Sequence, residues 1–305
     1  MSIERGARNV SAPSANNNCC ANILRQLQHA RRRFEQLGWW RLDDWLDSPL
    51  WTFHDTRAAL LIVPLELGPN DALAHSQASV AWVRWAAVAD GVSATPCLRA
   101  MFADVEARLT AQGVRELWCV VRSSDWLSPY LSDHGYALTD RLLTYEIRLD
   151  ERPKQSKCLP ADVFIRRATT DDLAALCALD ALSFDAPWRY PPALMHVMFE
   201  RAFEISVAER ASQIVGYASS KLHPWNGHVV RLAVHPSARR HGIGRALLND
   251  QVSRLAQTGL RVISLNTQSS NWAAQQLYRQ LGFRRLSGEV RVLRKSLIQG
   301  EDEVA

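Results

Sequence analysis

The chain carries one pattern of short motifs twice, once near the end of each half. Ala-Gln-Gly at 111–113 resembles Ala-Gln-Thr-Gly at 256–259, and Ser-Ser-Asp-Trp at 123–126 resembles Ser-Ser-Asn-Trp at 269–272. The motif that follows ends in a glycine and an aromatic residue in both halves, at 130–136 and 277–283. Matches in the same order, flanked by similar strand-like and helix-like runs, indicate a diverged duplication. The sequence therefore predicts two copies of one structural unit.

The apolar pattern predicts the type of each unit and its limits. Strand-like runs alternate with amphipathic helices in both halves, which indicates an α/β (α+β) fold. A helix is expected over residues 22–37, where apolar residues recur at helical spacing among strong helix formers. With 305 residues the chain has room for two domains. We predict a disordered tail at 1–22, a first domain at 23–150, a polar linker at 151–162, a second domain at 163–295 and a C-terminal tail at 296–305.

Composition argues against several classes of protein. No apolar run approaches the roughly 20 residues needed to cross a bilayer, and the polar N-terminus lacks the apolar core of a secretory signal. The six cysteines lack metal-ligand spacing, so we expect reduced thiols, no bound metal and a cytoplasmic location. The net charge of +5 is not gathered on one element with aromatic platforms, which argues against a nucleic-acid partner.

The most specific motif lies between an apolar strand and an amphipathic helix, and reads Arg239-Arg240-His241-Gly242-Ile243-Gly244. Glycines let the backbone approach a phosphate closely, and the amides at a helix N-terminus point at a bound anion. Arginines add charge-assisted hydrogen bonds. The alternative interpretation of this motif is a turn at the start of a helix with two solvent-exposed arginines. The flanking strand and helix favour a phosphate-binding loop.

The residues around this loop resemble those of a known family. The stretch 231–248, Arg-Leu-Ala-Val-His-Pro-Ser-Ala-Arg-Arg-His-Gly-Ile-Gly-Arg-Ala-Leu-Leu, resembles the coenzyme-A loop of the GNAT superfamily of N-acetyltransferases. The stretch 271–283, Asn-Trp-Ala-Ala-Gln-Gln-Leu-Tyr-Arg-Gln-Leu-Gly-Phe, resembles its downstream signature. The resemblance covers Val163 to about Leu293. With the repeat, it implies two GNAT-like domains, each with a mixed, mostly antiparallel central sheet flanked by helices. Phe-Asp-Ala-Pro-Trp-Arg at 184–189 also resembles, over this short stretch, the ribosomal-protein alanine acetyltransferases.

The resemblance implies acetyl-CoA as cosubstrate and indicates where it binds. Backbone groups near Leu232, Ala233 and Val234 would hold the acetyl and pantetheine arm. In the family the adjacent strand diverges at this point and leaves amides free to polarise the carbonyl. Asn271 would bond the arm. The pyrophosphate would be held by Arg239, Arg240, His241, Gly242, Ile243, Gly244 and Arg245.

The resemblance also implies direct attack of an amine on the thioester, with Tyr278 protonating the leaving thiolate. The alternative for Tyr278 is a half-buried core aromatic. For the base, His228 lies where histone-acetylating relatives carry a glutamate, and an imidazole suits the work. The ribosomal-protein branch uses a glutamate on the next strand, where this chain has Asn266, which favours His228 or a water-mediated route. Further alternatives for the base are Asp185, Glu204 and His223.

The family builds its acceptor site in the loop between the first two helices of the unit. In the second half this loop carries Trp188, Arg189 and Tyr190. These residues either shape substrate selection or pack the loop. Both interpretations stay open at this point.

The first half has lost the loop. Ser93, Pro96 and Leu98 stand where the second half has an arginine and two glycines. Proline removes an amide donor, and leucine blocks close backbone approach, so the first domain is predicted to be degenerate. Eight of the eleven tryptophans lie in this half. They either build a core or form an aromatic surface that docks on the second half or helps to form its acceptor cleft.

The sequence thus predicts an acetyl-CoA-dependent N-acetyltransferase. The acceptor is expected to be a primary amine of a peptide or small molecule, whose identity the sequence does not indicate. The alternative is a catalytically silent acyl-CoA-binding sensor or interaction module. No membrane or nucleic-acid partner is expected, and the chain is predicted to be a monomer or a homodimer.

Overall fold

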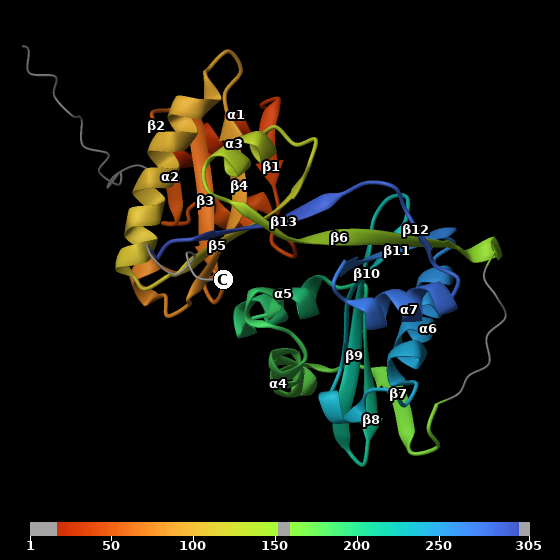
Figure 1. Ribbon diagram of the computed structural model, residues 1–305. Helices are drawn as coiled ribbons and strands as arrows, with labels where there is room; N and C mark the ends of the chain where they lie inside the picture. Colours follow the sequence, from red (N-terminus) through yellow and green to blue (C-terminus); the bar gives the residue numbers. More distant parts are fainter. Residues whose placement is uncertain (1–16, 152–158, 299–305) are drawn as a thin grey trace, which may run out of the picture.

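The computed structural model describes residues 17–151 and 159–298 of the chain. The predicted tail up to residue 16, most of the predicted linker and the end of the predicted C-terminal tail lie outside these residues. One mixed sheet of 13 strands runs through both halves, with helices on its faces (Figure 1). The predicted α/β fold class is confirmed, although the two predicted sheets are joined into one.

The first half contributes the elements up to β6. In chain order they are α1 (Asn17–Leu27), β1 (Arg32–Glu35), β2 (Trp51–His54), β3 (Ala58–Pro64), β4 (Val80–Val88), α2 (Ala94–Ala111), β5 (Glu116–Arg122), α3 (Leu127–Asp133) and β6 (Ala137–Arg148). Leu60 and Ile62 of β3 pack against α2, whereas Leu61 and Val63 pack against α1 on the other face. This alternation is the period of two of a strand, and it buries β3 on both faces.

The second half repeats the order strand, strand, helix, strand, helix, strand. Its elements are β7 (Val163–Arg167), α4 (Leu173–Ser183), α5 (Pro192–Arg201), β8 (Glu204–Arg210), β9 (Gln213–Leu222), β10 (Gly227–Val234), α6 (Ile243–Ala256), β11 (Val262–Gln268), α7 (Trp272–Gln280), β12 (Arg284–Arg285) and β13 (Val290–Ser296). Helices α4 and α5 cover one face of β8–β10. Helices α6 and α7 pack on the other face of the sheet, over β10 and β11.

Two features of the strands support the duplication. β4 and β5 are parallel neighbours, as are β10 and β11, and each of these pairings spans three residues. A bulge interrupts β4 at Arg84 and β10 at Val230. The repeat aligns these two positions, because they lie equally far before Ser93 and Arg239. A bulge re-aims the side chains that follow it, so both halves keep the same local bend.

The two halves exchange their last strands. β6 pairs with β11 of the second half, from Leu142 opposite Gln268 to Arg148 opposite Val262. β13 pairs with β5 of the first half, and β6 and β13 also pair with each other. Figure 1 shows β6 and β13 crossing between the two parts of the molecule. Each part of the sheet therefore contains a strand from the other half. The domain limits 23–150 and 163–295 remain a proposal, and they divide the sequence without dividing the sheet.

The start of the chain differs from the sequence-based expectation. The helix predicted over 22–37 is wrong beyond Leu27, and α1 begins at Asn17, inside the predicted tail. Residues 32–35 form β1, which pairs with β4 and buries Phe34 in the core beneath α2. Tertiary pairing thus overrides the helical propensity of this stretch. At the other end β13 extends to Ser296, the first residue of the predicted C-terminal tail.

Candidate active site

A cleft of about 930 Å³ opens where β10 and β11 separate. The two strands pair from Gly227 to Val229, and the rest of β10 pairs with β9 alone among the described strands. The split exposes one edge of β10, whose amides are then available to a carbonyl in the cleft. Of the residues predicted to hold acetyl-CoA, those that line the cleft are Leu232, Ala233, Val234, Arg239, Arg240, Gly242, Ile243, Gly244, Arg245 and Asn271.

The loop before α6 has the backbone that its glycines predict. Gly242, with φ of 81°, is the N-cap of α6, and this left-handed conformation favours glycine. Arg240 also has a positive φ, of 70°. A helix leaves the amides of its first turn without partners inside the helix, and Ile243, Gly244 and Arg245 of this turn border the cleft. The arrangement is that of an anion site at a helix N-terminus.

Gly244 keeps space open beside this turn. A Cβ atom there would lie 3.6 Å from Val234 Cγ2 and 3.7 Å from Leu277 Cδ2, both on residues of the cleft. The aligned residue of the first half, Leu98, is 1% exposed and packs in the core. Helix α2 begins at Ala94, so the residues aligned with the loop form its first turns. The described part of the first half thus fills the space that Gly244 leaves open.

Two arginines of the cleft are held by neighbouring groups. Arg239 Nε donates to the carbonyl of Val234 at 3.1 Å, and Arg245 donates to Gln280 Oε1 at 2.5 Å. These contacts hold positive charge at the loop end of the cleft. His241, which was also predicted to hold the pyrophosphate, is exposed and does not line the cleft.

Asn271 and Tyr278 share one face of α7 and are placed differently. Asn271 Oδ1 accepts a hydrogen bond from the amide of Ala274 at 3.1 Å and caps the helix, which leaves Nδ2 as a donor. Tyr278 is 6% exposed and does not line the cleft, and its ring centroid lies 5.7 Å from that of Tyr145. Burial raises the pKa of Tyr278 above 10, so the hydroxyl stays protonated at neutral pH. Tyr278 is therefore packed like a core aromatic residue. Its hydroxyl keeps the proton that a general acid would have to donate.

His228 lies at the closed end of the split and does not line the cleft. Its Nδ1 is 2.8 Å from Ser264 Oγ, and its ring centroid is 6.2 Å from that of His223. Burial, together with the nearby His223 and Lys221, lowers the pKa of His228 to about 4. Because its ring lies outside the cleft, the geometry does not favour the predicted role of His228 as the base.

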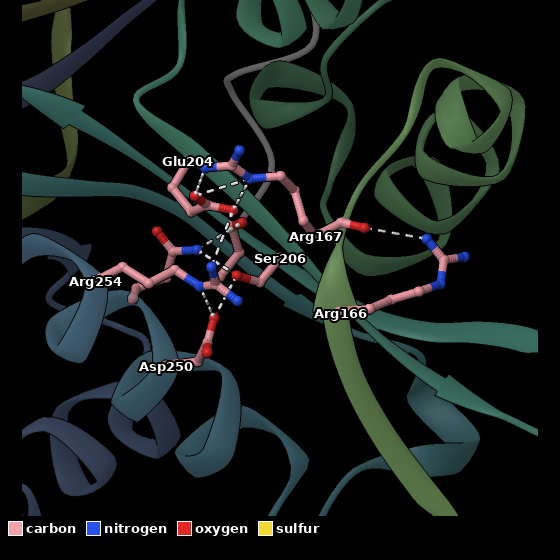
Figure 2. Close-up of polar contacts among 8 residues, drawn as sticks. Arg166, Arg167, Glu204, Ser206, Asp250 and Arg254 are labelled. Atoms are coloured by element: carbon pink, nitrogen blue, oxygen red, sulfur yellow. Dashed lines mark hydrogen bonds and ion pairs between the residues drawn. The ribbon is translucent and has the colours of Figure 1, made fainter.

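Glu204, another candidate for the base, belongs to a separate buried cluster. Figure 2 shows its carboxylate in contact with Arg167 and Arg254. Arg167 Nε donates to Glu204 at 2.9 Å, and Arg254 Nη1 lies 3.8 Å from it. The carboxylate is 2% exposed and its charge is already balanced. Of the four candidates for the base, Asp185 is the one that lines the cleft.

A buried ion pair, which no sequence motif indicates, holds the loop after α4. Arg231 of β10 lies 2.6 Å from Asp180 of α4, and their side chains are 8% and 0% exposed. Arg231 also donates to the carbonyl of Trp188 at 2.7 Å, and Asp180 accepts from the amide of Tyr190 at 2.8 Å. The pair therefore fixes the loop that brings Trp188 to the cleft.

The two other predicted acceptor residues do not line the cleft. Arg189 is exposed and donates to the carbonyl of Phe184 at 3.0 Å. The hydroxyl of Tyr190 accepts from Trp39 Nε1 at 3.2 Å, across the junction of the halves. Trp39 is 2% exposed and packs in the core beneath α4 and α5. Part of the tryptophan set of the first half thus docks on the second half, while Trp45 and Trp85 are buried within the first.

The first half supplies part of the cleft wall, which is one of the alternatives predicted for its tryptophans. Trp118 of β5 and Thr139 and Asp140 of β6 line the cleft. These residues reach it because β6 lies beside β11 and β13 lies beside β5. No motif marks the two strands for exchange, since each would also complete the sheet of its own half.

Asp140 joins the two halves through hydrogen bonds. Its carboxylate accepts from the amide of Ser269 at 3.1 Å and from the hydroxyls of Ser269 and Ser270, each at 2.5 Å. Burial alone would raise the pKa of Asp140, but these hydrogen bonds lower it overall. Because Ser270 directly precedes Asn271, Asp140 fixes the loop that presents Asn271 to the cleft.

Neither a spanning helix nor a metal cluster is found in the part of the chain that the structure describes. No helix there combines the length and apolar character needed to cross a bilayer. Histidine, cysteine, aspartate and glutamate do not gather there in groups of three or more that could hold a metal ion.

Known proteins are similar to parts of this chain. Residues 174–283 match the model of the Acetyltransferase (GNAT) family. An N-alpha-acetyltransferase of Sulfurisphaera tokodaii is 31% identical over 153 residues, which cover 45% of this chain and 87% of the relative. A mycothiol acetyltransferase of Kocuria rhizophila is 35% identical over 92 residues, or 28% of this chain. That match spans 30% of the relative's length.

The likeness in fold extends to both halves. A solved tandem GNAT protein from the clavulanic acid biosynthesis pathway has a TM-score of 0.57 with this chain, at 14% identity. The superposition covers 80% of each chain, which is more than either half contains. At this identity the likeness concerns the fold alone.

Proposed function

This chain belongs to the GNAT family of acetyltransferases, and we propose that its second half transfers an acetyl group from acetyl-CoA to an amine of a peptide or small molecule. The observation that carries the proposal is the split between β10 and β11, which opens beside the glycine and arginine loop. Such a cleft offers strand amides to a carbonyl and helix amides to a phosphate. Relatives named N-alpha-acetyltransferase and mycothiol acetyltransferase support acetyl transfer and leave the acceptor open.

The residues around the cleft fit acetyl-CoA. The amides of the first turn of α6, with Arg239, Arg240 and Arg245, hold the pyrophosphate. Asn271 Nδ2 donates to the pantetheine arm. The free edge of β10 at Leu232–Val234 holds the acetyl group, and its amides polarise the thioester carbonyl.

Two side chains handle the protons. The acceptor nitrogen attacks the carbonyl carbon of the thioester, so that a C–N bond forms and the C–S bond breaks. Asp185 accepts the proton of the amine, directly or through one water. Tyr278 donates its phenolic proton to the departing sulfur. It lies four positions after Ala274, a cleft residue, and therefore on the same side of α7.

Release of coenzyme A in the presence of primary amines tests the proposal. Peptides with free N-termini, polyamines and arylalkylamines are assayed with the intact chain. We expect amine-dependent release, which Asp185→Asn slows about a hundredfold and His228→Gln slows far less. Release that does not depend on any amine of the panel would sink the proposal. The reverse order of the two variants would assign the base to His228.

A second function is favoured by one observation, the packing of Tyr278 in the core. An acyl-CoA-binding sensor without turnover needs the loop and the split and has no use for an acid. Acetyl-CoA binding without amine-dependent release of coenzyme A would support it. Tyr278→Phe would then leave both the affinity and the absence of turnover unchanged.

A further inference from the structure

Tryptophans from both halves form one wall of the cleft. Trp118 of the first half and Trp188 of the second line the cleft, and Trp82, which is 3% exposed, contacts both. The ring centroid of Trp82 lies 5.9 Å from that of Trp118 and 5.4 Å from that of Trp188. Trp82 Nε1 donates to the carbonyl of Pro187 at 3.1 Å. A buried tryptophan thus packs against two others that line the cleft.

The sheet register places this wall beside the exchanged strands. Val292 of β13 pairs with Val120 of β5 and with Asp140 of β6, and Val292 also lines the cleft. Trp118 Nε1 donates to Glu116 Oε2 at 2.9 Å. Because its one donor is occupied, Trp118 lines the cleft without offering it a free N–H group.

Charge separates the wall from the loop. Among the described residues that line the cleft, the cationic side chains are those of Arg239, Arg240 and Arg245, all at the loop. The Asp140 carboxylate lines the cleft on the side of the wall, whereas the guanidinium of Arg84, which lies 5.3 Å from the Trp82 ring centroid, does not line the cleft. The loop end therefore suits phosphate, and the wall suits a neutral or cationic group with an apolar face.

We propose that Trp118 and Trp188 form the acceptor site, and that the acceptor is a primary amine that carries an aromatic ring. The inference rests on the proposed acetyl transfer and names the substrate class of that site. The ring packs offset or edge-on against the indoles. Before it loses its proton, the ammonium group is attracted by the indole faces and by the nearby carboxylate. The first half thus determines the specificity of a reaction that the second half carries out.

Three amines of graded structure test this inference with the intact chain. 2-Phenylethylamine and 2-cyclohexylethylamine share a carbon skeleton and differ in aromaticity, and n-butylamine has no ring. KM is measured by release of coenzyme A, and Kd is measured by calorimetry with coenzyme A bound. The variants are Trp118→Leu, Trp118→Phe, which keeps a ring if the leucine variant fails to fold, and Trp225→Leu as a control. Trp225 is 87% exposed and does not line the cleft.

The inference expects 2-phenylethylamine to bind several-fold more tightly than the cyclohexyl analogue and more tightly still than n-butylamine. Trp118→Leu raises its KM and Kd about tenfold, Trp118→Phe restores most of the loss, and neither variant changes the affinity for acetyl-CoA. Equal binding of the three amines would overturn the inference, as would a loss confined to acetyl-CoA in Trp118→Leu. If amine binding depends on Trp118 but no coenzyme A is released, the proposed amine site stands and the proposed acetyl transfer is rejected.

Discussion

Asp140 accepts hydrogen bonds from the amide and the hydroxyl of Ser269, at 3.1 and 2.5 Å, across the junction between the two halves. Asp140 lies on β6, which belongs to the first half of the chain and pairs with β11 of the second. The loop that leads to Asn271 is therefore held by a side chain from the other half. The first half thus contributes to the wall of the candidate cleft, although the residues of its own aligned loop lie in the first turns of α2.

Replacing Asp140 by alanine should weaken acetyl-CoA binding roughly tenfold, because the loop before Asn271 loses hydrogen bonds to a charged group. The measurement is a calorimetric titration with acetyl-CoA. Asp150→Ala is the matched control, since Asp150 follows β6 and is exposed. Equal affinities of the two variants would contradict the role given to Asp140.

Arg231→Met should destabilise the protein by about 3–5 kcal/mol, because it leaves Asp180 buried without its cation. The loss is measured by urea unfolding at pH 7. Arg57→Met removes an exposed ion pair with Asp55 and should have a much smaller effect. A similar midpoint for the two variants would show that the buried pair does not hold the loop.

Tyr278→Phe should lower kcat about a hundredfold and leave the affinity for acetyl-CoA unchanged, because it removes the proposed proton donor and keeps the packing. Steady-state kinetics with a saturating amine give the comparison. Tyr145→Phe removes the hydroxyl of the neighbouring ring, which donates to Gln275 at 3.3 Å, and should keep kcat. Equal rates in both variants would favour the sensor function.

His228 should make stability depend on pH in a narrow window. Its pKa falls from 6.5 to about 4 on folding, so between these values the unfolded state binds a proton that the folded state does not. The free energy of unfolding therefore falls as the pH is lowered from 6.5 to 4, by about 3 kcal/mol over the whole range, and does not change further above pH 6.5 through this group. His228→Gln should flatten the decline of Tm over this range. An unchanged slope would mean that His228 is not held in its neutral form.

The repeat, the loop and the signature around Asn271 were predictable because each depends on neighbours in sequence. Gly242 has a positive φ and is the N-cap of a helix. The residue type predicts the first feature, and the position before an amphipathic stretch predicts the second. The strand at Arg32–Glu35 was not predictable in this way, since β4 supplies its partner from far along the chain.

The parts of the site that were missed depend on contacts between the halves. The alternation of β6 and β13 fits the sheet of either half equally well, so the sequence does not indicate their exchange. Asp140 and Trp118 reach the cleft through that exchange. The position of His228 in the strand suggests a base, but burial, together with the nearby His223 and Lys221, lowers its pKa, and the position in the strand does not indicate that burial.

The central claim is one acetyl-CoA site per chain, in the second half. Calorimetric titration of the intact protein with acetyl-CoA tests it most directly, with Gly244→Val as the matched variant, because a side chain there would occupy the space beside Val234 and Leu277. The account predicts a single site in the native protein and loss of that site in the variant. Two sites, no binding at millimolar acetyl-CoA, or a site that survives Gly244→Val would contradict it.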